Sequence, residues 1–208
     1  MNSYRYLHKR ILITSKARYE GSKRLMQHSW FSQWTLAFLA VGQIVFALLS
    51  AFKLVDPSIP ESQLDMASLF FAVVVLTYSL LLGMGDFSAR SSNIHQCGLQ
   101  LAKLARKINY KVIQCYESSE YEHSKFVGEY YGNLNRHENH IPQDYLIASY
   151  DYKKEYDELP SFPKIIFNYK LKIFTYRIFS FAHYFLSIFS ILAWGYYITD
   201  FSNSVPIS

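Results

Sequence analysis

The chain has 208 residues, of which 50% are hydrophobic and 18% charged, with a net charge of +5 and a mean hydropathy near zero. This length suffices for one ordinary domain with a core and suggests no more than that. The averages are typical of a soluble protein, but they mix two very different kinds of segment.

Residues 1–29 are basic. Seven arginines and lysines lie there against one acid, Glu20. The apolar positions are spaced as on an interrupted helix face, so we expect the segment either to lie on a membrane surface or to run straight into a membrane span. A cleaved signal peptide is not expected, because the first long apolar run begins only at residue 30. The face consists of Ile11, Leu12, Ser15, Tyr19 and Met26.

Three uncharged runs are long enough to cross a membrane. The first, residues 30–52, would rise about 34 Å as a helix, which exceeds the thickness of a bilayer core. The others cover residues 66–85 and 178–199. A buried helix of a soluble protein is the alternative, and it weighs most for the third run, which contains His183, serines and many aromatic residues. The short linker between the first two runs permits only an antiparallel arrangement, so residues 30–86 are predicted to be a two-span hairpin.

The distribution of charge predicts the topology. The basic N-terminal segment contrasts with the loop of residues 53–65, which holds one base and three acids. The positive-inside rule therefore puts the N-terminus and residues 87–177 in the cytoplasm, and three spans would leave the tail of residues 200–208 outside. Anionic lipid headgroups would attract the positive charge on the cytoplasmic side. Direct binding of nucleic acid is not indicated, although a basic, tyrosine-rich region leaves it open.

A helix is predicted from residue 88 to about residue 116. Apolar residues recur along it at helical spacing, and Lys111 interrupts them. Either intramolecular packing or a self-association seam explains such a stripe. If this one helix joins the two cysteines, they lie about 27 Å apart, too far for a disulfide, so both are predicted to be reduced thiols. The stripe consists of Ile94, Cys97, Leu101, Leu104, Ile108 and Cys115.

Two shorter helices are predicted over residues 119–134 and 143–158. Pro142 is expected to interrupt the regular structure between these two helices, because the residue before a proline avoids helical geometry. Two prolines within residues 159–164 mark the next break. The residues that follow are expected to continue as a helix into the third span.

The stretch RHENHIPQDY, residues 136–145, is the main candidate for chemistry. Its histidines are three residues apart, whereas the zinc-protease pattern needs four to put both on one helix face. His137, His140 and Asp144 are therefore weak candidates for a metal site, because no second cluster offers the remaining ligands. The sequence has no phosphate-binding glycine loop, nucleophile elbow or C-x-x-C motif. We expect neither an enzyme nor a cofactor.

Small and polar residues inside the predicted spans are candidates for helix packing or for lining a pore. Gln43, alone in the middle of the first span, is costly when it faces lipid and needs a helix partner or water. The second span has a face of small residues, whose four-residue spacing lets helices approach closely. The third span has a polar stripe. The second-span face consists of Ser68, Ala72, Val75, Ser79 and Gly83, and the third-span stripe of Ser180, His183, Ser187, Ser190, Trp194 and Tyr197.

The second span, the stretch GDFSARSSNIHQCGLQLAKLARKI after it, the later YYGNLNRHENHIPQDY and the C-terminal hydrophobic helix resemble the SLATT family of membrane effectors, in particular the branch encoded beside reverse transcriptases. These effectors are associated with SMODS nucleotidyltransferases and SLOG nucleotide-binding domains. The chain departs from the family pattern with Ile94 for methionine, Phe87 for tyrosine, and Gly98 for alanine, a change that costs a helix about 1 kcal/mol. The matching positions are Phe87, Arg90, His95, Cys97, Leu101, Leu104, Asn139, His140, Asp144 and Tyr145.

The resemblance implies an all-α membrane protein with a two-span hairpin, a cytoplasmic helical region and a C-terminal hydrophobic helix. The matched polar residues would be structural, with His140 and Asp144 capping, orienting or pairing, and His95 as a candidate partner. It also implies an antiviral effector of the bacterial inner membrane that oligomerises and, when activated, forms a pore or otherwise disrupts that membrane. Growth arrest or cell death would follow.

The expected partners are the lipid bilayer, other copies of the chain, and a reverse transcriptase or nucleotide-signalling protein encoded nearby. Two rival functions share the same sequence features. One is a nonconducting anchor or scaffold that recruits a cytoplasmic partner. The other is a membrane metalloenzyme built on His137, His140 and Asp144.

Overall fold

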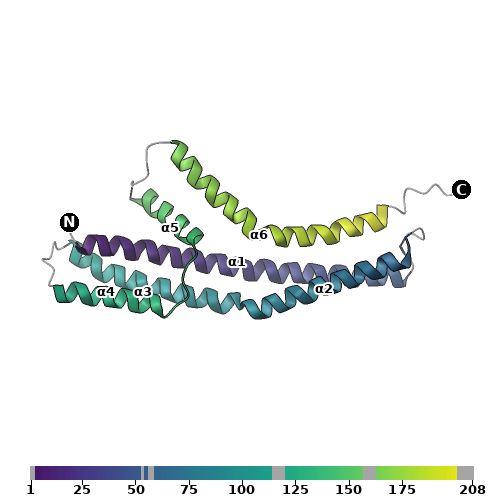
Figure 1. Cartoon of the computed structure of the whole chain (residues 1–208), viewed down its shortest axis with the longest axis horizontal. Coiled ribbons are helices and arrows are strands. Elements are labelled where there is room, and N and C mark those ends of the chain that lie inside the picture. The colour runs from purple at the N-terminus through teal and green to yellow at the C-terminus, as the bar shows by residue number, and fades with distance from the viewer. Residues whose placement is uncertain (1–2, 53, 56–58, 114–119, 157–162, 201–208) are drawn as a thin grey trace. The chain divides into compact units, whose positions relative to one another are not determined.

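A computed structural model describes residues 3–52, 54–55, 59–113, 120–156 and 163–200, and the regular structure within these ranges is entirely helical (Figure 1). Three apolar stretches, in α1, in α2 and in α6, are long enough to cross a membrane. The prediction of an all-α membrane protein is therefore confirmed. The helices are α1 (Ser3–Ala51), α2 (Glu61–Gly85), α3 (Phe87–Ile113), α4 (Glu120–Asn135), α5 (Pro142–Glu155) and α6 (Pro163–Asp200).

The helices form two units, which we describe one at a time. Unit 1 contains residues 1–27 and 87–177, and unit 2 contains residues 28–86 and 178–208. Unit 1 holds almost all of the basic residues, and unit 2 holds the long uncharged runs. α1 and α6 contribute residues to both units.

α1 is one continuous helix of 49 residues, so the basic segment runs straight into the first span, one of the two predicted alternatives. Several of its most buried side chains form a series that recurs every seven residues, a spacing that keeps one face of a helix against its neighbours. Met26, which we placed on the interrupted apolar face, is 57% exposed, whereas its neighbour Leu25 falls on this series and is buried. Tyr4, Ile11, Arg18, Leu25, Ser32 and Leu39 are each at most 3% exposed.

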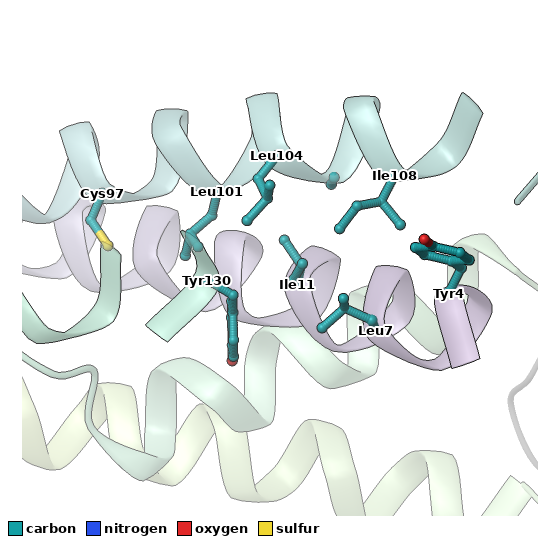
Figure 2. Packing of buried hydrophobic residues seen from close by; sticks show 9 residues of the cluster. Tyr4, Leu7, Ile11, Cys97, Leu101, Leu104, Ile108 and Tyr130 are labelled. Atoms are coloured by element: carbon teal, nitrogen blue, oxygen red, sulfur yellow. The ribbon is translucent and has the colours of Figure 1, made fainter. Parts of the chain in front are cut away.

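The core of unit 1 lies between α1, α3 and α4 (Figure 2). The predicted α3 stripe is buried from Ile94 to Ile108, so packing within the chain accounts for it. Lys111, which interrupts the stripe, forms an ion pair with Glu122 of α4 at 3.2 Å. Cys115 lies outside the described residues. The core side chains are Tyr4, Leu7 and Ile11 from α1, Cys97, Leu101, Leu104, Ala105 and Ile108 from α3, and Tyr130 from α4.

Two polar contacts fix α1 and α3 in an antiparallel register. The Ser15 hydroxyl donates to the Gly98 carbonyl at 2.9 Å, and the Ser22 hydroxyl lies 3.1 Å from that of Ser91. A Cβ atom at Gly98 would come within 3.1 to 3.3 Å of the Tyr19 ring. The glycine that we expected only to weaken the helix therefore makes room for an aromatic side chain.

The regular structure is interrupted before Pro142, as predicted, and α5 begins one residue earlier than expected, with Pro142 itself. This proline occupies the first turn, where a backbone N–H has no partner within the helix and a proline is tolerated. An unpredicted feature separates α2 from α3, where Asp86 adopts a left-handed conformation with φ 36°. Aspartate tolerates this conformation better than most residues, so it allows a one-residue break.

Unit 2 has a small apolar interior formed by Leu39, Phe71 and Ile191 from α1, α2 and α6. α1 and α6 approach closely there, since a Cβ atom at Gly42 would lie 2.3 Å from Cδ1 of Ile191. Many other apolar side chains of these helices are exposed, as expected for surfaces that face lipid.

Candidate functional site

The segment between α4 and α5 packs against α1 through a buried arginine. The seven-residue repeat of α1 places Arg18 on its buried face, where the residue is only 1% exposed. Its Nη1 donates to the backbone carbonyl of Glu138, while its Nε has no hydrogen-bond partner among the described residues. Because burying a guanidinium group costs free energy, this position depends on compensating negative groups nearby.

Asp144, at the start of α5, carries a buried carboxylate. Its carboxylate is 1% exposed and accepts two hydrogen bonds from Arg24, Nε to Oδ1 at 3.0 Å and Nη2 to Oδ2 at 3.1 Å. Oδ2 also accepts from the Ile141 backbone N–H at 3.2 Å, which caps the start of α5. Gly21 permits this approach, because a Cβ atom there would lie 3.0 Å from Oδ2. Asp144 therefore fastens α5 to α1.

Glu138 provides the second carboxylate and connects the same segment to α3. Arg90 Nε donates to its Oε2 at 2.8 Å, and Nη2 of Arg90 donates to Oε1. The hydrogen bonds from Arg90, and more weakly the positive charges of Arg24 and Arg18, hold the pKa of Glu138 below its usual value. Three arginines and two carboxylates thus join α1, α3 and the segment before α5. We call Arg18, Arg24, Arg90, Glu138 and Asp144 the arginine network.

The predicted metal ligands do not come together as a ligand set. Asp144 accepts from Arg24, and His140 lies 5.8 Å from the Tyr145 ring in a stacked geometry. Burial first, and then the charge of Arg18, lowers the pKa of His140, and its Nδ1 has no partner within the described part of the chain. Among the described residues, no group of three histidines, cysteines or carboxylates is placed to hold a metal ion.

The residues that match the SLATT pattern have separate positions in unit 1. Cys97, Leu101 and Leu104 belong to the core, and Arg90 belongs to the arginine network. His95 is exposed and contacts the Tyr19 ring at 5.2 Å, and no hydrogen bond among the described residues joins it to His140 or Asp144. Phe87 lies half-buried at the start of α3. Asn139, His140 and Tyr145 line a cavity of about 320 Å³ together with Arg10, Thr14 and Tyr130.

In unit 2, polar residues of α6 form hydrogen bonds with the other two helices. The Ser187 hydroxyl lies 2.7 Å from that of Tyr78 on α2, and the Ser180 hydroxyl lies 3.0 Å from Nε2 of His28 on α1. The other ring nitrogen of His28 lies 3.2 Å from the Tyr184 hydroxyl. Two members of the predicted stripe therefore join helices within one copy of the chain.

The other span candidates lie at the edge of unit 2. Ser190 and Trp194 line a groove of about 470 Å³ beside α2, and the side chains of His183 and Tyr197 are exposed. Gln43, Ser68, Ala72 and Val75 are half-buried, and Ser79 and Gly83 are exposed. A Cβ atom at Gly83 would meet nothing within 4 Å.

Sequence reasoning missed Arg18, Arg24 and His28 as structural residues. We counted the two arginines only as charges that set the topology. The signal that reveals Arg18 is the seven-residue spacing with Ile11 and Leu25, which polar residues at the intervening positions obscure. His28 has no comparable local signal, because its partners Ser180 and Tyr184 are about 150 residues away in the chain.

A comparison with known families finds a match over most of the chain. The family described as SMODS and SLOG-associating 2TM effector domain family 5 matches residues 2–196. No curated protein and no solved structure matches the chain.

Proposed function

The chain belongs to the SMODS and SLOG-associating 2TM effector domain family 5, and from this membership we propose that it oligomerises in the bacterial inner membrane and permeabilises it when activated. The resulting loss of the membrane potential arrests growth or kills the infected cell. The effector acts in the conflict between a bacterium and a virus. It has an N-terminus in the cytoplasm and a C-terminus outside, as the positive-inside rule predicts.

The observation that carries this proposal is the outer surface of α2. The three helices of unit 2 meet at the apolar cluster of Leu39, Phe71 and Ile191, and the hydroxyl pair of Tyr78 and Ser187 is used in joining helices. A conducting path through a single copy would therefore have to pass this apolar cluster. Ser79 and Gly83 are exposed instead, with open space around Gly83, and small residues let a second helix approach closely.

Gln43 supports a wet path between copies. It lies half-buried near the middle of the first span, and no hydrogen bond joins its side chain to a described residue. In a membrane an amide without a partner costs several kcal/mol, so assembly that brings Gln43 to water or to another copy is favourable. The small face of α2 then provides the contact, and Gln43 contributes to the lining.

Membrane potential in living bacteria tests the proposal. Cells that express the chain alone, or with its neighbouring genes, are followed with a potential-sensitive dye during phage infection. We expect depolarisation from the wild-type chain and its loss in the variant Gln43→Leu/Ser79→Leu. An intact potential under every condition would favour a nonconducting anchor that recruits a cytoplasmic partner. Unchanged depolarisation by the double variant would show that these two residues have no part in conduction.

A further inference from the structure

Unit 1 contains a cavity that the membrane function does not use. Its volume is about 1010 Å³, and its walls come from the first turns of α1, the second half of α3 and the end of α5. Small-molecule sites typically occupy about 300–1,000 Å³, so the cavity has room for a ligand of nucleotide size. The residues that decide its chemistry are Arg5, Lys9, Arg106, Tyr6, Tyr152 and Tyr156.

The walls of this cavity are cationic. Arg5, Lys9 and Arg106 contribute three positive charges, and no acid occurs among the described lining residues. Neither Arg5 nor Arg106 forms an ion pair with a described residue. The next lysines of α3 differ, since Lys107 pairs with Glu129 at 3.8 Å and Lys111 with Glu122 at 3.2 Å. The charges of α3 that face α4 are thus neutralised, whereas Arg106 on the cavity side keeps a guanidinium fork that suits phosphate.

The same walls offer aromatic surfaces. The rings of Tyr152 and Tyr156 are stacked at 4.5 Å with an interplanar angle of 26°, and Nζ of Lys9 lies 5.3 Å from the centre of the Tyr152 ring. Tyr152 is buried, but Tyr156 is 49% exposed and Tyr6 is 60% exposed, so these two present ring surface to a ligand. Exposed aromatic rings beside cations bind bases by stacking while the cations bind phosphate.

We propose that this cavity binds a nucleotide or a short oligonucleotide, with Arg5 and Arg106 holding its phosphates and the rings of Tyr6 and Tyr156 stacking on its bases. The cations alone would suit any polyanion, and the rings alone would suit any planar molecule. Their combination in one cavity selects a ligand that carries both features. His8 also lines the cavity, and burial lowers its pKa, which leaves a neutral imidazole for hydrogen bonding.

The test is equilibrium binding to the purified full-length chain in detergent, with labelled ATP and the dinucleotide pApA as probes. This experiment does not depend on membrane permeabilisation. We expect saturable binding of at least one probe, weakened about tenfold or more by Arg106→Gln and by Tyr156→Leu. Lys107→Gln removes the same charge from the next residue of α3, and Tyr156→Phe keeps the ring, so both should bind as the wild type does.

Three results would overturn the proposal. The first is the absence of saturable binding for both probes. The second is an equal loss in Arg106→Gln and Lys107→Gln, which would indicate diffuse attraction to a basic surface. The third is binding that is competed equally well by inorganic triphosphate and by unlabelled ATP, and that phosphatidylglycerol vesicles abolish. The site would then recognise the phosphate of lipid headgroups and not a base. Thermal unfolding of each variant identifies any that has not folded.

Discussion

Arg18 shows how strongly one residue depends on its surroundings in unit 1. Its charge is permanent, its burial is almost complete, and the Glu138 carbonyl accepts one of its hydrogen bonds. Two carboxylates of the arginine network offset the positive charge of three arginines only in part. We therefore expect the network to be sensitive to the loss of either carboxylate.

The first prediction concerns Asp144→Asn. The substitution removes the buried negative charge opposite Arg24, so it should lower the free energy of unfolding by about 3 kcal/mol. In a chain of this size, each 1 kcal/mol corresponds to a fall in Tm of roughly 2–4 °C. Thermal unfolding in detergent, followed by tryptophan and tyrosine fluorescence, measures the effect.

Glu155→Gln provides the control for this substitution. It breaks the ion pair of Lys16 and Glu155, which also joins α1 to α5, but the Glu155 side chain is 58% exposed. Solvent screens such a pair, and we expect a change of at most about 0.5 kcal/mol. Equal effects of the two substitutions would contradict the view that the buried Asp144 contact fastens α5.

The second prediction concerns pH. Burial and Arg18 lower the pKa of His140 below its ordinary value of 6.5 in the folded chain. Between the folded and unfolded pKa values the unfolded chain therefore binds more protons, and stability must rise with pH in that window. Acidification from about pH 7.5 to about pH 5.5 should lower the Tm of the wild type more than that of His140→Gln.

His137→Gln controls for the loss of a histidine from the same segment. It should retain the wild-type difference in Tm between the two pH values. A pH dependence that is the same in His140→Gln and the wild type would show that another group titrates. Glu138 cannot account for it, since its pKa lies below 4.5 and its contribution to stability is lost only as the pH falls further.

At the scale of elements, α1 and α6 approach each other closely at Gly42 in unit 2. Gly42→Leu places a side chain against Ile191, which is itself 5% exposed, and we predict a destabilisation of about 1–3 kcal/mol. Ile191→Ala should restore part of the loss by making room. Thermal unfolding of the single and double variants in detergent measures both effects.

Gly132→Leu is the matched control on α4. A Cβ atom there meets nothing within 4 Å, and leucine has a better helix propensity than glycine, so this variant should be as stable as the wild type or more stable. If Gly42→Leu behaved in the same way, α1 and α6 would not be packed as described.

The helices differ in how well the sequence predicts them. The stripe of α3 is uninterrupted and apolar from Ile94 to Ile108, so both the helix and its buried face were evident. In α1 the seven-residue series includes the polar residues Arg18 and Ser32. A search for apolar residues alone therefore placed Met26 on the helix face and left out Leu25. The start of α5 was predicted to within one residue, because Pro142 is compatible with a first turn as well as with a break.

At the scale of the whole molecule, composition and charge were sufficient to predict an all-α membrane protein. The bilayer sets the length that an uncharged run needs and the side on which basic residues gather. Both features can therefore be interpreted without knowing which residues are in contact. The arginine network and the cationic cavity were not predictable, because each brings together side chains from α1, from α3 and from the part of the chain after α4. Such contacts depend on tertiary packing and have no signature in any single segment.

A substitution at Gly83 can test the assembly of several copies without disturbing the fold of one copy. Its surroundings are open in the single chain, so Gly83→Leu should leave the chain folded and inserted while it prevents a second helix from approaching α2. Ala193→Leu enlarges another exposed small residue in the membrane and is the matched control. Equal amounts of both variants in the membrane fraction would show that expression is comparable.

The most direct measurement is membrane potential and chemical cross-linking in the same infected cells, for the wild type, Gly83→Leu and Ala193→Leu. Our account predicts cross-linked oligomers and depolarisation for the wild type and Ala193→Leu, and neither for Gly83→Leu. Depolarisation by Gly83→Leu at the wild-type level, or cross-linked oligomers of the wild type with an intact potential, would contradict it.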